Sequence, residues 1–254
     1  MNTFKAAVIS AFAVVASSGG LETAAQAQER TAVRDGFAFD PAKPAKIILF
    51  RPSVKVGEQS TGGMFEPRAE WTAEARKNIE EALNARQKSL GHQVTYMLDV
   101  PGEKAQTVRE YQALFGAVAQ SVITYQFFAG NRLETKKRDN REGIFQWSLG
   151  PGVQDLPGAD KADYILFILT EDHYGSTGRK IFQFLAAAAV GVGVTSGLHA
   201  GYAGLVDAKT GNLVWINADN AMGGNVREAD GAQKRVTQLL EEFPLATNKS
   251  VIGQ

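Results

Sequence analysis

The last third of the chain, residues 162–243, carries the pattern that most restricts how this sequence can fold. It begins with a nearly continuous apolar run, Ala162–Thr170, that contains aromatic and β-branched residues. Such a run is typical of a strand buried on both faces of a sheet. Further on, residues 207–211 (DAKTG) predict a tight hairpin, because the aspartate accepts from nearby N–H groups and the glycine adopts positive φ. The end of the chain therefore predicts adjacent strands of one sheet.

The residues that flank this hairpin complete the pattern. The sequences AGLV and NLVWIN read as strands, which predicts Leu213 and Trp215 on one face and Val214 and Ile216 on the other. Residues 227–243 then predict an amphipathic helix that the following proline ends. Its inner face is predicted to contain Ala232, Val236, Leu239, Leu240 and Phe243.

The first part of the chain alternates between shorter strand and helix patterns. We predict strands at 46–50, 93–98 and 144–149, and helices at 70–90 and 104–128. Loops are predicted at 53–67 and 150–160. The charge-rich segment at 133–141 is expected to be a solvated surface, with an anion or partner contact as the alternative. The order of elements predicts an α/β (α+β) sandwich with a mixed sheet of about five strands and flanking helices. This single domain covers residues 46–245, after an extended lead-in at 28–45 and before a flexible tail at 246–254.

Residues 181–206 contain no Asp, Glu, Lys or Arg, and a run of 26 uncharged residues is long enough to cross a membrane. The run is nevertheless rich in alanine and glycine, and glycine weakens a continuous helix. We therefore expect a helix at 181–190, a glycine turn and a strand at 199–206. Membrane contact through 181–206 is the alternative.

The first 27 residues are typical of a secretory signal peptide. Lys5 supplies a positive charge, an apolar stretch follows at 6–16, and Ala25 and Ala27 form a cleavage signal that ends near Ala27. The alternative is an N-terminal membrane anchor. The chain has no cysteine, which excludes a lipid-anchored N-terminus, disulfides and thiolate chemistry. We therefore expect a periplasmic protein of a Gram-negative bacterium.

The best candidate site in the sequence follows the strand at 162–170. Ligand sites in open α/β sheets lie beyond the carboxyl ends of strands, and the segment 171–180 (EDHYGSTGRK) stands at such an end. The candidate ligand-binding residues are Asp172, His173, Tyr174, Ser176 and Arg179. The alternative is an ordinary hydrophilic turn.

Other chemistry finds little support in the sequence. His92 is expected to be a surface or capping residue, and His199 a half-buried residue with its hydrogen bonds satisfied. No zinc motif, nucleophile elbow or dinucleotide fingerprint is present, so we expect no catalytic residue, metal or cofactor. The formal net charge is zero, which does not favour nucleic acid as a partner.

The hairpin at 204–215 (GLVDAKTGNLVW) and the later segment 239–244 (LLEEFP) resemble a group of bacterial envelope proteins. That fold group includes the curli-secretion CsgG-like domain, the penicillin-binding-protein activator LpoB and related lipoproteins. The resemblance covers about the last 90 residues, and it implies an α/β envelope protein. Lipid anchoring does not carry over, because the chain has no cysteine.

Three functions follow as expectations. The first is a non-enzymatic periplasmic envelope protein that mediates protein–protein interaction or assembly, with an envelope protein or a second copy as partner. The second is a small-ligand-binding protein or hydrolase-like enzyme that uses the 171–180 loop. The third is a membrane-associating protein that uses residues 181–206.

Overall fold

The structure, a computed structural model, describes residues 30–40, 42–136, 144–180, 183 and 197–245. These residues form one mixed sheet of eight strands, in the order β1-β8-β7-β6-β2-β5, with β3 and β4 attached beside β6. The strands are β1 (Thr31–Val33), β2 (Lys46–Phe50), β3 (Ser53–Gln59), β4 (Phe65–Pro67), β5 (Gln93–Met97), β6 (Tyr164–Gly175), β7 (Leu198–Asp207) and β8 (Leu213–Asp219).

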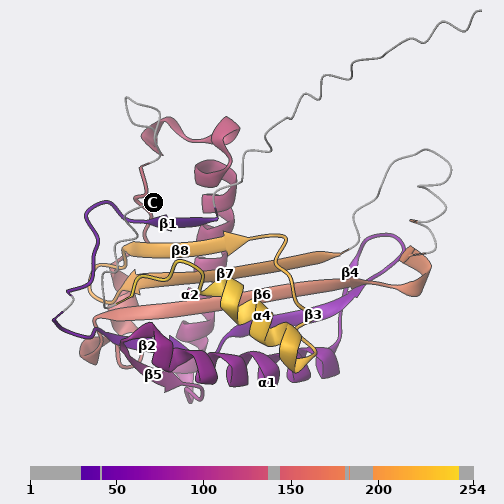
Figure 1. The fold of residues 1–254 in the computed structure, drawn as a ribbon, viewed down its shortest axis with the longest axis horizontal. Helices are drawn as coiled ribbons and strands as arrows, with labels where there is room; N and C mark the ends of the chain where they lie inside the picture. The colour runs from indigo at the N-terminus through magenta and orange to yellow at the C-terminus, as the bar shows by residue number, and fades with distance from the viewer. Residues whose placement is uncertain (1–29, 41, 137–143, 181–182, 184–196, 246–254) are drawn as a thin grey trace, which may run out of the picture.

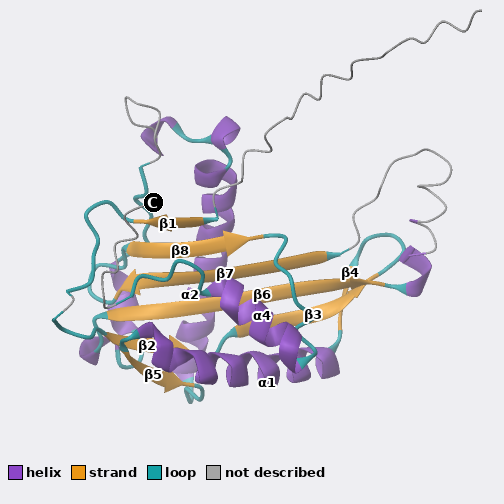
Figure 2. Cartoon of the chain, in the orientation of Figure 1, coloured by secondary structure: helices purple, strands orange, loops and turns teal. Residues whose placement is uncertain are grey.

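Among the described residues, three α-helices cover the two faces of this sheet: α1 (Ala69–Arg86), α2 (Glu103–Val122) and α4 (Ala229–Leu239). In Figure 1, α1 and α4 lie in front of the sheet and α2 lies behind it. Figure 2 shows the same layers by secondary structure. The predicted α/β (α+β) sandwich is confirmed, with eight strands where the sequence predicts about five.

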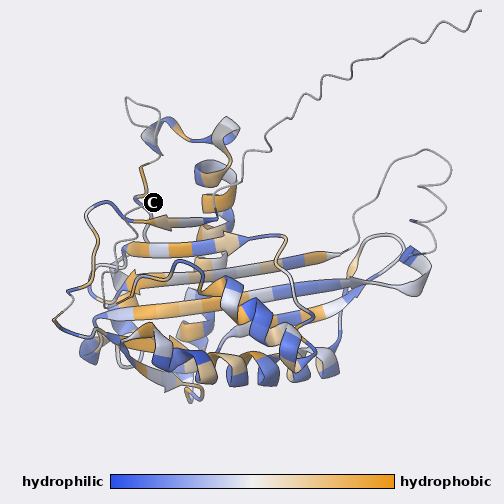
Figure 3. Cartoon of the chain, viewed as in Figure 1, coloured by the Kyte–Doolittle hydropathy of each residue, from blue (hydrophilic) through white to orange (hydrophobic). Residues whose placement is uncertain are grey.

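Each face of the sheet has its own apolar core. Leu166, Ile168 and Trp215 pack toward α1 and α4, and the side chains between them along β6, such as Phe167, pack toward α2. This follows from the alternation of side chains along a strand. Figure 3 shows hydrophobic residues along the central strands and hydrophilic ones on the outward side of α1. Residues 165–168 of the long strand β6 are therefore buried on both faces, as the apolar run predicts.

The central strand β6 has different parallel neighbours along its length. Its first half pairs with β2, from Ile47 opposite Tyr164, and its second half pairs with β3, from Ser53 opposite Leu169. On its other side β6 pairs antiparallel with β7 along almost its whole length. The chain leaves β2 and enters β3 through Arg51 and Pro52 only.

Several predicted elements are confirmed with small changes of their ends. The helix predicted at 70–90 is α1 followed by a short 3-10 turn, and the strand predicted at 93–98 is β5. The helix predicted at 104–128 is α2 followed by a π-helical segment at Ile123–Phe127. The tight hairpin at 207–211 joins β7 to β8, and the predicted inner face of the last helix is buried.

The extended lead-in at 28–45 contains the short strand β1, which pairs with β8. Three predictions about the fold are wrong. The loop expected at 53–67 contains β3 and β4. Residues 144–149 form only an isolated bridge, at Ser148. The faces expected in β8 also differ, because the pairing shifts at Leu205 and leaves Val214 as an extra residue. Val214 therefore joins Trp215 in the core under α1 and α4.

Other expectations fall on residues outside the described ranges: the signal peptide at 1–27, most of the charge-rich segment, all of the helix at 181–190 except residue 183, and the tail at 246–254. The strand expected at 199–206 is confirmed as β7. Within the described ranges, no helix has the length and hydropathy needed to cross a membrane.

Candidate functional site

The five candidate residues at 171–180 do not converge on one site. The strand β6 runs on to Gly175, so alternation places Asp172 and Tyr174 on the face of α1 and α4. His173 points to the opposite face, where its ring stacks on Phe65 at 4.1 Å between ring centroids. The segment that the sequence predicts to be a polar loop is therefore largely a strand.

Asp172 belongs to a buried ion pair with the helix α4. Its two carboxylate oxygens accept from Arg235 Nη1 at 2.9 Å and from Nη2 at 2.8 Å, and both side chains are fully buried. His199, whose side chain is partly exposed, places its Nδ1 2.6 Å from Oδ1 of the same carboxylate. Burial alone raises the pKa of Asp172, but the hydrogen bonds from His199 and Arg235 outweigh it and lower this pKa.

The Arg235 guanidinium also fixes the loop that precedes α4. Its Nε donates to the carbonyl of Gly223 at 3.0 Å, and Nη2 donates to the carbonyl of Gly224 at 3.3 Å. The N–H groups of Arg235 therefore donate to the Asp172 carboxylate and to backbone carbonyls, and none of these bonds is directed at a ligand. We therefore assign Asp172 a structural role, in which it joins β6 to α4.

Tyr174 is held in a stack of aromatic and cationic groups. The Arg227 guanidinium lies 3.9 Å from the centre of the Tyr174 ring and 4.6 Å from that of Trp71. The Tyr174 hydroxyl donates to Asn225 at 2.8 Å, and burial raises its pKa to about 12. These contacts join β6, α1 and the loop before α4, and they leave the phenol protonated at neutral pH.

The remaining candidates lie near the end of β6. The side chain of Ser176 accepts from the N–H of Arg179 at 3.1 Å, which caps the helical turn that begins at Thr177. The Arg179 guanidinium lies beside the turn at Gly63. His173 contacts Glu171 at 2.8 Å. Within the described part of the chain, the candidates therefore make local contacts on two sides of the sheet.

His92 also differs from the expectation of a surface or capping residue. Its ring packs on Phe39 at 4.1 Å between centroids, Nδ1 accepts from the N–H of Ala45, and Nε2 lies 3.2 Å from the carbonyl of Pro244. This pattern needs the neutral ring with its proton on Nε2. Burial lowers the pKa of His92, although the bond to Pro244 acts in the opposite direction. His199, half-buried and paired with Asp172, matches its expectation.

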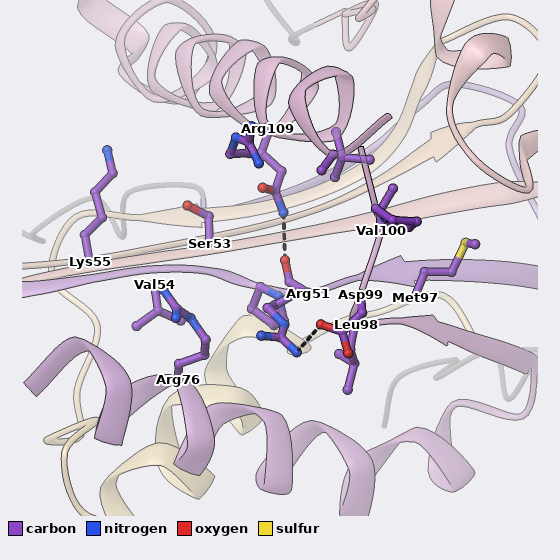
Figure 4. Close-up of a pocket in the computed structure, with 15 residues that line it drawn as sticks. Arg51, Ser53, Val54, Lys55, Arg76, Met97, Leu98, Asp99, Val100 and Arg109 are labelled. Atoms are coloured by element: carbon purple, nitrogen blue, oxygen red, sulfur yellow. Dashed lines mark hydrogen bonds and ion pairs between the residues drawn. The ribbon is translucent and has the colours of Figure 1, made fainter. Parts of the chain in front are cut away.

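The sequence analysis missed a cavity that the described residues form. This cavity has a volume of about 730 Å³ and lies at the carboxyl ends of β2 and β5. The strand β5 ends at Met97, whereas the segment after β2 continues as β3 along β6. The cavity opens at this step in the sheet edge. Its walls come from α1 on one face of the sheet and from α2 on the other, as Figure 4 shows. This is the edge at which parallel α/β sheets commonly bind ligands.

Four cationic side chains and one acidic side chain, Asp99, line this cavity. The four are Arg51, Lys55, Arg76 and Arg109. Asp99 pairs with Arg51 at 3.1 Å, and the cavity therefore carries an excess of positive charge. Glu80 forms a second ion pair with Arg51 at 3.4 Å, and Glu171 lies 3.9 Å from Lys55.

Arg76 and Arg109 differ from the other two cations. Arg109 donates to the neutral side chain of Gln106 at 2.7 Å, and no acidic partner of either arginine lies within the described ranges. The Nε of Arg76 is buried with no hydrogen-bond acceptor in that part of the chain. This Nε is closed to solvent, so an anion in the cavity would be held by the Nη groups at the end of the Arg76 side chain.

The backbone adds to this arrangement. The N–H of Val56 bonds to the side chain of Thr72 rather than to β6, so alternation directs the N–H of Val54 away from β6 as well, toward the cavity. Gln112 of α2 donates to the carbonyl of Arg51 at 2.7 Å and holds α2 against the bend between β2 and β3. The only sequence signal for this site is Arg51-Pro52 directly after a buried strand.

A second unusual surface lies at the end of α2. Tyr125, Phe128 and Leu133 form what we call the apolar tip, and their exposed fractions are 43%, 54% and 42%. The N–H of Leu133 donates to the carbonyl of Tyr125 at 3.2 Å, which folds the segment back on itself. Figure 1 shows this segment standing beyond the edge strand β1.

No protein-family model matches the chain, and no curated protein matches it. Among solved structures, the PelC dodecamer from Paraburkholderia phytofirmans aligns with a TM-score of 0.33 at 12% identity, over 85% of this chain and 97% of that chain. A point variant of the same dodecamer aligns over the same shares at 10% identity and a TM-score of 0.33. At that TM-score the likeness supports no argument about this chain. The resemblance to CsgG-like and LpoB-like envelope proteins stays a prediction.

Proposed function

We propose that this protein is a non-enzymatic binding protein of the periplasm that holds an anionic ligand in the cavity between α1 and α2. One observation carries the proposal: Arg76 and Arg109 line that cavity, and neither has an acidic partner in the described part of the chain. Export to the periplasm rests on the predicted signal peptide at 1–27.

The chemistry of the cavity favours an anion over a neutral ligand. Arginine is always charged and presents several N–H groups in a planar fork that matches carboxylate or phosphate oxygens. Arg76 comes from α1 and Arg109 from α2, so positive charge reaches the cavity from both sides of the sheet. The ligand would be held by charge-assisted hydrogen bonds, and the proposal needs no cofactor.

The test is a titration of the purified chain with inorganic phosphate at low salt, measured by calorimetry. Arg76→Gln removes one charged donor, and a hydrogen bond to a charged group contributes about 1.5–3 kcal/mol, so affinity should fall roughly ten- to a hundred-fold. Arg86→Gln removes the same charge from the exposed end of α1, away from the cavity, and serves as the matched control.

The control variant should bind phosphate within about twofold of the wild type, and added salt should weaken both, because ions screen partly exposed charges. The proposal is wrong if the wild type binds no phosphate, or if Arg76→Gln and Arg86→Gln weaken binding equally.

We propose self-association as a second function, because the apolar tip exposes three large side chains on one short segment. Large apolar side chains that gather exposed on one segment are typical of an interaction site. The partner we favour is a second copy of the chain, since the sequence has 27 basic and 27 acidic residues and its copies have no net charge to repel one another.

Light scattering coupled to size exclusion, at increasing protein concentration and without detergent, tests this second function. The wild type should form a discrete oligomer, and the variant with Tyr125→Ser, Phe128→Ser and Leu133→Ser should be a monomer. Val33→Ser alters an exposed apolar residue of β1 outside the tip and should leave the mass unchanged. A wild-type monomer at every concentration refutes the function, and so does a triple variant with the mass of the wild type.

A further inference from the structure

Part of the cavity between α1 and α2 is lined by apolar side chains that an anion would not contact. Beside the four cations, its lining includes Met97, Leu98, Val100, Pro101, Ala105 and Val108. Figure 4 shows Lys55 and Arg76 at one end of the site and Met97 and Val100 at the other, with Arg51 between them. The cavity thus has a cationic end and an apolar end.

We propose that the ligand is a single amphiphilic molecule, with an oxyanion bound at Arg76 and Arg109 and an alkyl or aryl body bound against Leu98 and Val100. This inference rests on the proposed function and names the chemical class of its ligand. A simple inorganic anion would leave the apolar end of the cavity in contact with water, and that contact is unfavourable.

The size of the cavity supports an organic ligand. An oxyanion of five heavy atoms, at roughly the 30 Å³ that a water molecule occupies in the liquid, fills about 150 Å³. The cavity volume is about 730 Å³, so most of the space is left after the anion is bound. This volume is in the range typical of pockets that enclose small organic ligands, which are lined mostly by apolar side chains with a few polar groups.

Leu98 is the most informative apolar residue in the lining. Met97 and Val100 are partly buried and pack against the core under α2, which explains their presence without a ligand. Leu98 is partly buried as well, and it lines the cavity. Unlike Met97 and Val100, it packs against neither of the two apolar cores. A partly exposed leucine that serves no core can cover an apolar ligand body.

A chain-length series tests the inference. The probes are inorganic phosphate and ethyl, butyl and hexyl phosphate, each below the concentration at which it forms micelles, and the readout is the dissociation constant from calorimetry. Burial of one methylene contributes about 0.8 kcal/mol, which corresponds to about a fourfold change in affinity. We expect the wild type to gain up to about fourfold per methylene until the apolar end is filled.

Variants separate the two ends of the cavity. Leu98→Gln should weaken hexyl phosphate by about tenfold or more and leave inorganic phosphate within about twofold of the wild type. Leu114→Gln changes an exposed leucine of α2 outside the cavity, and the wild-type series should persist. Arg76→Gln should weaken every member of the series by the same factor. A folded circular-dichroism spectrum is required of each variant.

The possible failures are distinguishable. If inorganic phosphate binds but affinity does not rise with chain length, the amphiphile is refuted and the proposed anion-binding function stands. If no probe binds, the proposed function fails as well. If hexyl alcohol or hexylammonium binds as tightly as hexyl phosphate, the cavity is an apolar pocket without anion recognition, and both proposals are wrong.

Discussion

Replacement of Arg235 by methionine is the sharpest test of how this fold is held together. The guanidinium is fully buried and donates to both oxygens of Asp172, to the hydroxyl of Thr170 and to the carbonyls of Gly223 and Gly224. Methionine has a similar apolar stem and none of these donors. The substitution therefore removes one partner of a buried ion pair with little change of volume.

The cost of this substitution follows from what it leaves behind. Asp172 would remain buried and charged, with only His199 and Thr170 beside it. Removal of one partner of a buried ion pair costs about 3–5 kcal/mol, against a total stability of about 5–15 kcal/mol for a typical domain. The two orphaned loop carbonyls each add a cost on the order of 1 kcal/mol. We therefore expect Arg235→Met to lose about 3–5 kcal/mol or more in the free energy of unfolding.

Urea unfolding followed by tryptophan fluorescence at neutral pH measures this loss. The double variant Arg235→Met with Asp172→Leu removes both charges and should recover much of it, because apolar pairs often replace buried ion pairs at little cost. Lys234→Met removes a charge from the exposed side of α4 and should change stability by less than about 0.5 kcal/mol. The reasoning is refuted if Arg235→Met costs less than about 1 kcal/mol, or if the double variant loses the sum of both single variants.

Three further predictions concern single groups. Burial holds the pKa of His92 below its ordinary value of 6.5, so the folded state favours the neutral ring. The stability that this difference in pKa contributes is complete above about pH 6.5, and it is lost as the pH falls toward the lowered pKa. In unfolding experiments between pH 7 and 5, His92→Gln should therefore lose less stability than the wild type. Gly211 has a φ of +72°, and a side chain at such a φ costs about 1–3 kcal/mol of backbone strain. Gly211→Ala should destabilise the protein by more than this, because the new Cβ would also lie 1.8 Å from the carbonyl oxygen of Gly150. Gly102→Ala, at φ +63° in open space, should cost only the strain, which urea unfolding would show. Ultraviolet titration should find three tyrosines that ionise only near pH 12 because they are buried; they are Tyr96, Tyr174 and Tyr202.

The parts of the fold that the sequence predicts are those with a local cause. The hairpin at 207–211 is predicted because Asp207 accepts from the N–H groups of Lys209 and Thr210, and both contacts lie within three residues. The inner face of α4 is predicted because its apolar residues recur at helical spacing. In each case the signal lies within one element, so the sequence of that element is sufficient.

The role of Asp172 and the cavity were missed because both depend on residues far apart in the chain. Asp172 has the sequence pattern of a surface residue, and its buried partner Arg235 lies 63 residues later in the chain. The cavity likewise joins Arg51, Arg76 and Arg109 from three different elements, and no spacing rule connects them. Only the register of the sheet brings these residues together. The sequence could direct attention to the carboxyl ends of the strands, but it pointed to β6 rather than to β2 and β5.

The bend at Arg51 and Pro52 sets how β3 pairs with β6, and this pairing determines which β3 side chains enter the core and where the cavity opens. Leu49 pairs with Leu166 and Ser53 pairs with Leu169, so four residues of this chain segment face three of β6, which amounts to one extra residue. This extra residue places Val54 and Val56 in the core under α1, together with Leu49.

Deletion of Pro52 would remove the extra residue and reverse the faces of β3. Val54 and Val56 would leave the α1 core, at a cost of about 1.5–3 kcal/mol each, and the charged Lys55 would enter it. We therefore expect the deletion variant to be unfolded or to lose at least about 3–6 kcal/mol in urea unfolding.

Pro52→Ala keeps the residue count, so it should keep the register and lose only the roughly 0.4–1 kcal/mol that proline contributes by restricting the unfolded chain. If the deletion variant is as stable as Pro52→Ala, the register does not set the faces of β3. The cavity would then need another explanation, because it exists where β5 stops and the shifted strand continues along β6.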